Sequence, residues 1–527
     1  MTEIKVSPAR RRRVASIWKN PLLMTWIPLL FTVDAFQFPT FSSRHINTRQ
    51  MKSQSQSTSL SMSESPREMN VAVVGGGPAG LLLSHLLLKN NQSRNKETTT
   101  KITVFESRKD PRLLSTESRA YALGIGIRGR TAIRQVDEEL WESVKAVGYE
   151  SERFQLHVGR FVIPLRSEAD GKRSENAKSV EPSLLLFQSS LCQALAEALS
   201  RRHGASGNLK LVFNQKVETC DFDSMKLTTK VPDGDSINEF GPFDLVIGSD
   251  GVNSVVRDAI QKAFPSFGSV KEQLPGEFKV VRLEKPVGGK VDPKAVSLIL
   301  PKKGSVTAFV EPTDNDGDCC ILFAGRGETP ILSNTSNRTL MMETLNEAFP
   351  QWQEFHEEIA DQLMNKATTG SASSVRCNTY NYGGKAALIG DACHATGGVS
   401  GQGVNSALCD SVALAESIQK HSNDLPRALL EYSKRQVPEG KALYDLSFGP
   451  KPTGFKKLKW SLRTVRDTLF RGKLGIGRPP LQTRLTTNLV PFSTIRREVD
   501  KYYDYPFPED SKIHQQLEEL NDKATGL

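Results

Sequence analysis

Residues 71–90 read VAVVGGGPAGLLLSHLLLKN and predict a strand, a glycine-rich turn and a helix in immediate succession. The run VAVV is apolar and β-branched, which is typical of a buried parallel strand. Glycines then stand at 75, 77 and 80, the G-x-G-x-x-G spacing of a dinucleotide-binding fingerprint. In that fingerprint Gly75 permits the tight turn, Gly77 lets a pyrophosphate approach the backbone, and Gly80 lets helix and strand pack closely. Free N–H groups at the start of the helix would hold the phosphate charge.

A second strand carries an acid to the same edge of the expected sheet. KITVFES, at 101–107, predicts the next parallel strand and places Glu106 at its carboxyl end. An acid there can bind ribose hydroxyls, which favours FAD or NAD over a 2′-phosphorylated nucleotide. A glycine cluster alone could be an ordinary turn, and Glu106 alone could be an exposed acid at the end of a strand. The prediction of a dinucleotide site therefore depends on the two patterns occurring together.

Two later strand ends carry an aspartate followed by a helix. FDLVIGSDGVNSVVRDAI, at 243–260, predicts a buried strand that ends in Asp250 and Gly251. AALIGDACHATGGVSGQGVNSALCD, at 386–410, predicts a strand ending at Asp391 and a glycine-rich loop that opens a long helix at about Gly403. Such an acid and such a loop of amides can hold a ribityl chain and polarise the edge of an isoalloxazine ring.

Length and composition describe a soluble globular protein of two to four domains, with 527 residues, 38% hydrophobic and 24% charged. The seven cysteines are scattered and show no metal-ligand spacing, which indicates free thiols in a reducing compartment. Residues 451–500 hold twelve Lys and Arg against three Asp and Glu, while the body of the chain is mildly acidic. Nucleic acid is therefore not an expected partner. The basic stretch is either a solvated face or a peripheral contact with an anionic membrane.

The first 69 residues predict a targeting leader with an unstructured continuation. A basic cluster at 10–13 precedes an apolar run at 21–35 that is too short to span a membrane. The sequence that follows is rich in Ser, Thr and Arg and nearly free of acids, and the whole is similar to two-part plastid leaders. A plastid is the expected location, with a mitochondrial presequence or a secretory signal as alternatives.

Taken in order, the three motifs resemble the class A FAD-dependent aromatic monooxygenases, and the similarity extends to proteins of the kynurenine 3-monooxygenase type. It is carried also by SRAYALGIGIRGRTAI, SVRCNTYNYGGKAALIGDACHA and PPLQTRLTTNLVPFSTIR, and spans about 70–500. The resemblance implies an α/β fold: a Rossmann-like FAD domain of the glutathione-reductase type, an interleaved antiparallel-sheet substrate domain and a C-terminal helical region. The expected boundaries are 70–430 for the monooxygenase domain (FAD part about 70–165, 183–260 and 375–430; sheet-rich substrate part about 270–375) and 431–527 for the helical, basic region.

Periodicity and turn signals add expectations for individual elements. They predict one helix over 128–148, a meander of strands over 209–231, four antiparallel strands over 278–324, and helices at 337–349 and 352–365.

The resemblance also implies an activity. NAD(P)H would reduce the bound FAD, and reaction with O2 would give a C4a-hydroperoxyflavin that hydroxylates a small aromatic substrate. The cofactor supplies the chemistry, so no catalytic side chain is predicted. Two other functions stay open: a flavin-dependent epoxidase or reductase of a prenyl or carotenoid-type lipid, and a non-catalytic flavin-binding protein. The oligomeric state is not implied.

The site residues implied by the resemblance fall into one cofactor group and one substrate residue. The cofactor group is Gly75, Gly77, Pro78, Ala79, Gly80, Glu106, Arg119, Gln188, Asp250, Gly251, Asp391, Gly401, Gln402, Gly403, Val404 and Asn405. Arg153 matches an arginine that binds a substrate carboxylate, for which the planar guanidinium is suited; a surface arginine is the alternative. No metal is expected.

Three departures from the family pattern bear on these implications. Gln188 stands where an arginine usually contacts FAD. The loop after Asp391 reads Gly397, Gly398, Val399, Ser400 in place of a proline and bulky residues, which predicts a smaller or more flexible wall. The tyrosine that would partner Arg153 is replaced near Pro182. Beside these, His394 is expected to pack or hydrogen-bond beneath the flavin, and Cys393 to be a small buried hydrophobe.

Overall fold

The computed structural model describes residues 67–92, 98–113, 121–159, 161–166, 182–232, 234–284, 292, 294–421, 424–449, 458–459, 462 and 481–503. Arg119, almost all of the predicted leader and most of the basic stretch at 451–500 lie outside these residues. Across the described part of the chain, no helix combines the length and the hydropathy that crossing a membrane requires.

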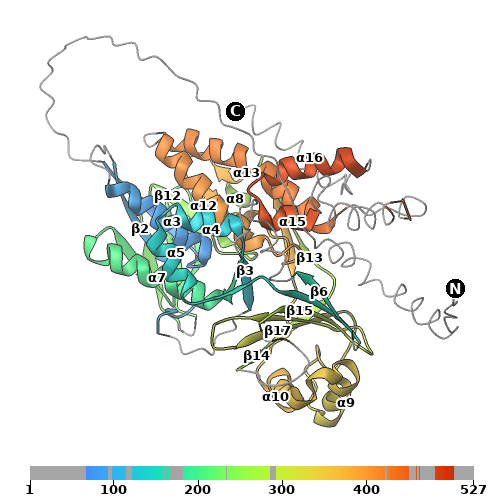
Figure 1. Cartoon of the computed structure of the whole chain (residues 1–527). Coiled ribbons are helices and arrows are strands. Elements are labelled where there is room, and N and C mark those ends of the chain that lie inside the picture. The colour runs from blue at the N-terminus through green and yellow to red at the C-terminus, as the bar shows by residue number, and fades with distance from the viewer. Residues whose placement is uncertain are drawn as a thin grey trace, which may run out of the picture.

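A mainly parallel sheet forms the centre of the larger body (Figure 1). Its strand order is β19 (Asn381–Tyr382), β20 (Ala386–Leu388), β12 (Leu245–Gly248), β1 (Arg67–Val74), β2 (Thr98–Phe105) and β8 (Leu209–Val212). Only the edge strand β19 runs antiparallel. The apolar run predicted as a buried strand is the centre of β1, where Val71 and Val73 are fully buried.

Helices pack against this sheet and against one another. The first is α3 (Pro78–Lys89), the helix predicted after the glycine turn, and it contacts α7 (Gln188–His203) and α12 (Gly403–Lys420). Helix α8 (Val255–Ala263) follows β12, and the short α11 (Asp391–His394) follows β20.

The helix predicted over 128–148 is in fact two helices, α4 (Ile127–Arg134) and α5 (Glu138–Lys145). The break occurs because the Asp137 side chain accepts a hydrogen bond from the backbone N–H of Leu140 at 2.8 Å and so begins a new helix. Asp137 lies inside an apolar periodicity that continues across it, which is why the pattern predicted one helix.

A second six-stranded sheet lies beside the first body, with helices on its outer face (Figure 1). Its order is β14 (Glu277–Leu283), β17 (Cys319–Gly325), β16 (Thr307–Pro312), β15 (Val296–Leu300), β5 (Phe154–Val158) and β6 (Phe161–Arg166). Helices α9 (Arg338–Ala348) and α10 (His356–Asn365) cover one face. The four antiparallel strands expected over 278–324 are confirmed. Strands β5 and β6, expected in the FAD part, instead extend this sheet, because β5 pairs in parallel with β15.

Three small sheets complete the described strands. They are β3-β7-β4 (Ala122–Ile125, Ser183–Phe187, Tyr149–Ser151), β11-β10-β9 (Ile237–Phe240, Lys226–Lys230, Lys216–Asp221) and β13-β18 (Ser269–Gln273, Ser373–Cys377). The predicted meander over 209–231 is thus divided: β8 joins the large parallel sheet, and only β9 and β10 continue into an antiparallel meander.

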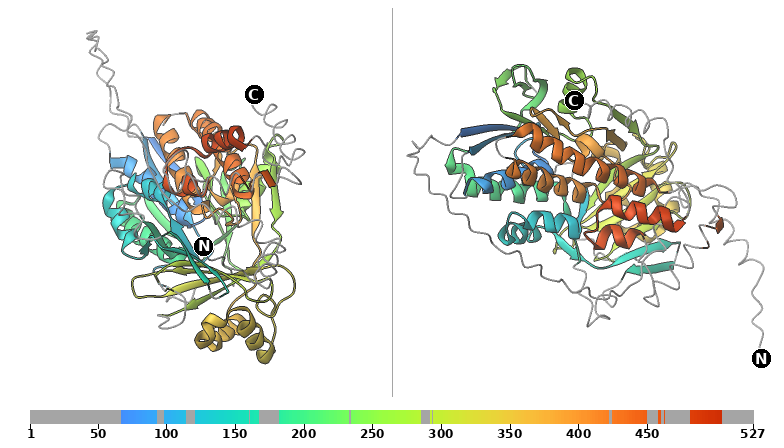
Figure 2. Two further views of the ribbon diagram at one scale, coloured as in Figure 1. Left: turned by 45° about the vertical axis from the view of Figure 1, so that its right-hand side comes forward. Right: turned by 90° about the horizontal axis from the view of Figure 1, so that it is seen from above.

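The boundary predicted at 430/431 falls inside one continuous helix, α13 (Leu425–Phe448). That helix packs along α12, and Tyr432 donates a hydrogen bond from its hydroxyl to the carbonyl of Leu388 at 2.8 Å. Helices α15 (Leu481–Thr487) and α16 (Phe492–Tyr503) pack against its C-terminal half, and the view from above shows α16 alongside it (Figure 2). The C-terminal helices therefore share a core with α13. The predicted α/β class, with a second sheet and a helical C-terminal region, is confirmed.

Candidate functional site

Four of the predicted motifs meet at the carboxyl edge of the parallel sheet. Strand β1 lies between β2 and β12, and β20 follows β12, all four in parallel register. Their last residues are therefore neighbours, and the glycine turn, Glu106, Asp250 and Asp391 follow them directly. This edge, where crossover connections diverge, is where parallel sheets bind nucleotides.

The three fingerprint glycines occupy three different environments. Gly75 has a φ of +107°, and a Cβ there would stand 2.3 Å from the Ser249 carbonyl oxygen. A Cβ at Gly80 would stand 2.3 Å from the Gly75 carbonyl oxygen, so α3 and β1 pack too closely for any side chain. A Cβ at Gly77 would meet nothing within 4 Å. The fold therefore requires Gly75 and Gly80, whereas Gly77 borders open space. Because α3 begins at Pro78 without a side-chain cap, its first turn can receive an anion.

Glu106 is buried against this turn. Its Oε2 accepts a hydrogen bond from the Gly76 N–H at 2.9 Å, and its Oε1 accepts one from the Arg108 N–H at 2.8 Å. Burial alone would raise the pKa of Glu106, but the hydrogen bonds and charge of Arg108 outweigh it and lower the pKa. Glu106 is therefore an ionised acceptor beside the turn, as a ribose-binding acid must be.

The Asp250 motif is fastened to the same turn. The Ser249 hydroxyl donates to the carbonyls of Val74 and Gly75 at 2.9 and 2.8 Å. Asp250 accepts the Val255 N–H at 2.7 Å through Oδ2, while its buried Oδ1 has no hydrogen-bond partner among the described residues. Burial raises the pKa of this carboxyl. An orphaned buried oxygen at this edge is an unfilled acceptor for a ligand. Gly251 follows with a φ of +77° and open space around it.

Asp391 and the start of α12 lie together. A Cβ at Gly403 would stand 3.9 Å from Asp391 Oδ1, so the first residue of α12 borders this carboxyl. The Asp391 side chain keeps access to solvent, but the protein packed around its carboxyl raises the pKa; the charge of His394 opposes this rise and that of Asp410 adds to it. Tyr121 is affected by the charge of Asp391 as well. Burial is the larger cause, and together they raise the pKa of Tyr121 to about 12. Asp391 and Tyr121 therefore belong to one neighbourhood.

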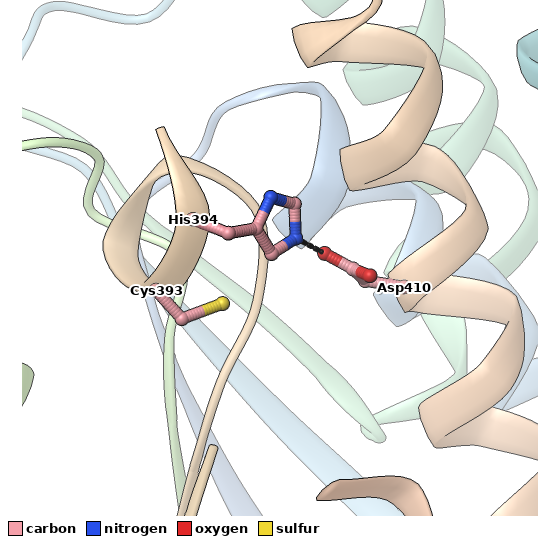
Figure 3. Close-up of side chains that lie close together, drawn as sticks. All are labelled: Cys393, His394 and Asp410. Carbon is pink, nitrogen blue, oxygen red and sulfur yellow. Dashed lines mark hydrogen bonds and ion pairs between the residues drawn. The ribbon is translucent and has the colours of Figure 1, made fainter. Parts of the chain in front are cut away.

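A buried ion pair holds the loop that carries Asp391. His394 Nε2 lies 2.5 Å from Asp410 Oδ2 (Figure 3), and that oxygen also accepts the Gly390 N–H at 2.8 Å. Burial lowers the pKa of His394, but the Asp410 charge and hydrogen bond outweigh it and raise the pKa. Asp410 on α12 thus ties down both ends of α11. His394 makes a hydrogen bond, with Asp410 as its partner, and its predicted position beneath the flavin stays a prediction.

Cys393 completes the group drawn in Figure 3. Its sulfur lies with the His394 and Asp410 ligand atoms within 4.8 Å of one another, an arrangement that could in principle hold a metal ion. Burial raises the pKa of Cys393 well above its usual range, and the thiol points at the Gly390 carbonyl at 3.3 Å. The Cys393 thiol, His394 Nε2 and Asp410 Oδ2 are thus engaged in hydrogen bonds within the protein. Cys393 is buried, as was expected of a small hydrophobic residue.

Residues 401–405 divide between the open site and the protein core. Asn405 is buried: its Oδ1 accepts the Gly126 N–H at 2.9 Å and its Nδ2 donates to the Gly124 carbonyl at 3.0 Å. Gln402 is also buried, while Gly401 has a φ of +64° and open space around it. Val404 lies in the first turn of α12 and packs on the core. Asn405 therefore positions this turn against the strand β3.

The loop at 397–400 packs more tightly than its glycines predicted. A Cβ at Gly397 would stand 2.3 Å from the Leu274 side chain, and Thr396 bridges to Ser374 on β18. These contacts hold Gly397 against the small sheet β13-β18, whereas a Cβ at Gly398 would meet nothing within 4 Å.

Two further predicted residues differ in their position: Gln188 borders Tyr121, and Arg153 lies on the second sheet. Gln188 is the first residue of α7, and its N–H donates to the Tyr121 carbonyl at 3.2 Å. Arg153 pairs with Asp292 at 3.1 Å, and Gln155 reaches the same carboxylate at 3.5 Å. These contacts point Arg153 away from the sheet face that carries Leu156. Its role as a substrate ligand stays a prediction.

The arrangement fits FAD. Gly77 leaves room beside an uncapped helix for a pyrophosphate, Glu106 offers an ionised acceptor, and Asp250 keeps an unsatisfied oxygen at the same edge. Asp391 and the start of α12 would border the remote half of such a cofactor.

Comparison with known proteins assigns the class. A family model described as "FAD binding domain" matches residues 68–447, and the chain belongs to that family. It is an FAD-dependent monooxygenase, an oxidoreductase that takes NAD(P)H as reductant.

Its relatives include kynurenine 3-monooxygenases of two bacteria. That of Xanthomonas oryzae pv. oryzae (strain MAFF 311018) is 28% identical over 384 residues, which cover 73% of this chain and 78% of that protein. That of Xanthomonas campestris pv. campestris (strain 8004) is 27% identical over 396 residues, 74% of this chain and 79% of that protein.

Solved structures share the fold. The tetrameric form of 2-methyl-3-hydroxypyridine-5-carboxylic acid oxygenase has a TM-score of 0.57 at 16% identity and covers 80% of this chain and 96% of its own. PqsL, a probable FAD-dependent monooxygenase from Pseudomonas aeruginosa, has a TM-score of 0.53 at 18% identity, with coverages of 76% and 100%.

Sequence reasoning missed two residues of this neighbourhood. Tyr121 stands two positions after Arg119 within the quoted stretch SRAYALG, where an aromatic beside a small-residue run was the available signal. Asp410 lies on α12 seven residues after Gly403, two helical turns along and so on the same face, which periodicity alone could have shown.

Proposed function

We propose that this protein hydroxylates a small aromatic substrate of the 2-aminophenyl ketone class, as kynurenine 3-monooxygenase-like enzymes do. Support comes from relatives named kynurenine 3-monooxygenase and from PqsL, whose structure was solved with 2-aminobenzoylacetate. Kynurenine and 2-aminobenzoylacetate both carry an amino group ortho to a ketone on one ring. The observation that carries the proposal is the convergence of the four cofactor motifs at one sheet edge, beside a second sheet.

When bound and reduced by NAD(P)H, FAD would activate O2, from which one oxygen atom goes to the aromatic ring and the other to water, while the protein binds and orients the reactants. The turn at 75–80 and the start of α3 would hold the pyrophosphate, and Glu106 the ribose hydroxyls. Asp391 would bind the ribityl chain. The first turn of α12, positioned by Asn405, would direct its N–H groups at the ring edge, where the helix dipole stabilises negative charge.

A turnover assay with the full-length protein tests this proposal. L-Kynurenine should accelerate NAD(P)H oxidation and O2 consumption and give a ring-hydroxylated product. If prenyl or carotenoid-type lipids accelerate oxidation and L-kynurenine does not, the lipid epoxidase or reductase alternative replaces this proposal. Bound FAD with no stimulation by either class would favour a non-catalytic flavin-binding protein.

We propose further that residues 1–69 direct the protein to a plastid. The support is the sequence alone: a basic cluster, an apolar run and an acid-poor continuation. A fluorescent fusion of this segment that enters mitochondria or the secretory route would contradict it. The membrane contact of residues 451–500 is a proposal of the same kind, tested by binding to anionic vesicles.

A further inference from the structure

The second sheet presents a continuous apolar row on the face opposite α9 and α10. In cross-strand register, Val280 pairs with Leu322, Leu322 with Phe309, Phe309 with Leu298, and Leu298 with Leu156. Residues directly opposite one another on neighbouring strands lie on one face of a sheet. Leu156 and Leu298 form their own small cluster, whereas Val281, Val310 and Ile321 pack on the helices of the other face.

An unpaired carboxyl, that of Glu311, stands on this apolar face in the described part of the chain. Glu311 lies two residues after Phe309 on β16, so its side chain emerges on the same side. It pairs across the sheet with Cys320, which in turn pairs with Arg282. The next row therefore reads Arg282, Cys320, Glu311. Asp318 forms an ion pair with Arg282 in this row, whereas Glu311 forms none with any described residue.

This row faces the part of the molecule that holds the cofactor motifs. Strand β16, which carries Glu311, contacts β7, and the Arg282 guanidinium lies 5.0 Å from the ring centroid of Phe187 on β7. Phe187 pairs in cross-strand register with Ala122 on β3, and β3 accepts a hydrogen bond from Asn405 at the start of α12. Glu311 thus lies on the sheet face that is turned toward β3 and β7, whereas α9 and α10 occupy the far side, as Figure 1 shows.

The Glu311 carboxyl has no hydrogen-bond or ion-pair partner among the described residues. The side chain is only partly exposed, and the surrounding protein raises the pKa of Glu311 to about 7 by burial. A half-buried acid without a partner is costly, and such groups concentrate at functional sites. Nothing in the packing of the second sheet requires a carboxyl here, because its neighbours along the strand, Phe309 and Val310, are apolar.

We infer that Glu311 accepts a hydrogen bond from the N–H or O–H substituent of the aromatic substrate while Leu298 and Phe309 contact the ring. This rests on the proposed aromatic hydroxylation and specifies which substrates the site selects. Electron-donating amino and hydroxyl groups activate a ring for electrophilic oxygen transfer, and both carry a hydrogen that a carboxylate can accept. A ring without such a donor would leave Glu311 buried and unpaired, which penalises its binding.

Equilibrium dialysis of the FAD-loaded, full-length protein tests the inference without turnover. The probes are 2-aminoacetophenone and acetophenone, which differ only in the amino group. The wild type should bind 2-aminoacetophenone about tenfold more tightly, the difference that a hydrogen bond to a charged acceptor supplies. Glu311→Leu should reduce the ratio of the two Kd values to about one, and Glu311→Gln, which keeps the shape, should reduce it to about threefold. The control Glu277→Gln removes an exposed carboxyl from the same sheet and should keep the wild-type ratio.

Two results would overturn the inference, and they are distinguishable. A wild-type ratio that persists in both Glu311 variants removes Glu311 from recognition and leaves aromatic hydroxylation standing. A wild type that binds neither probe, with normal flavin absorbance, contradicts both the role of Glu311 and the proposed substrate class.

Discussion

Replacing Gly77 by valine should separate folding from cofactor binding. Gly77 has φ −76° and ψ 178°, an extended conformation that valine adopts without strain, and its Cβ would meet nothing within 4 Å. The loss of glycine at this N-cap position costs about 1 kcal/mol, so the apoprotein should fold. The valine side chain would fill the space that the pyrophosphate needs. Losing two charge-assisted hydrogen bonds, each about 1.5–3 kcal/mol, should raise the Kd for FAD at least about a hundredfold.

The matched variant is Gly80→Ala, which should destabilise the fold itself and not block the space for the pyrophosphate. Its Cβ would stand 2.3 Å from the Gly75 carbonyl oxygen and 2.6 Å from Ser249 Oγ. Forcing α3 away from β1 should cost about 1–3 kcal/mol or more in the free energy of unfolding. Urea unfolding of both apoproteins, followed by FAD titration, measures the two effects separately. A Gly77→Val protein with wild-type FAD affinity would refute the placement of the cofactor.

Three further predictions concern buried ionisable side chains. Glu106→Gln removes the ionised acceptor beside Gly76 and should raise the Kd for FAD about tenfold. The control Glu68→Gln changes an exposed ion pair and should leave the Kd unchanged. If FAD titration gives the two variants equal affinities, Glu106 does not belong to the site. Asp410→Ala leaves His394 and the Gly390 N–H unpaired and should lower the free energy of unfolding by about 3–5 kcal/mol in urea; a loss below about 1 kcal/mol would show that the pair does not fasten this loop. Burial lowers the pKa of His85 from 6.5 to about 4, so below pH 6.5 the unfolded chain binds a proton that the folded chain does not. Stability should fall by about 3 kcal/mol between pH 6.5 and 4, and His85→Leu should flatten that part of the profile; an unchanged profile would contradict it.

The sequence predicted the parts of the site that depend on local chemistry. A β-branched run, glycines at fixed spacing and an apolar helix specify a strand, a turn and a helix within twenty residues, and the structure has them as β1 and α3. Strand ends that carry Glu106, Asp250 and Asp391 were recognisable for the same reason. Their convergence followed from the rule that parallel strands end at one edge.

Features that depend on distant pairing were not predictable in this way. Strand β5 pairs with β15, about 140 residues further along, and no local pattern specifies that partner. The break between α4 and α5 depends on one cap, Asp137, inside an unbroken periodicity. Glu311 belongs to a strand whose alternation was visible, but which face looks toward the cofactor motifs is set by the arrangement of the two sheets.

The proposed reaction transfers one oxygen atom from O2 to an aromatic ring. The most direct measurement is turnover of the full-length, FAD-loaded protein under isotope-labelled O2 with NAD(P)H and L-kynurenine, with mass analysis of the product. The account predicts a hydroxylated product that carries one labelled atom, with NAD(P)H consumption that depends on the substrate. A hydroxylated product without label, or NAD(P)H consumption with no change in the aromatic ring, would contradict it.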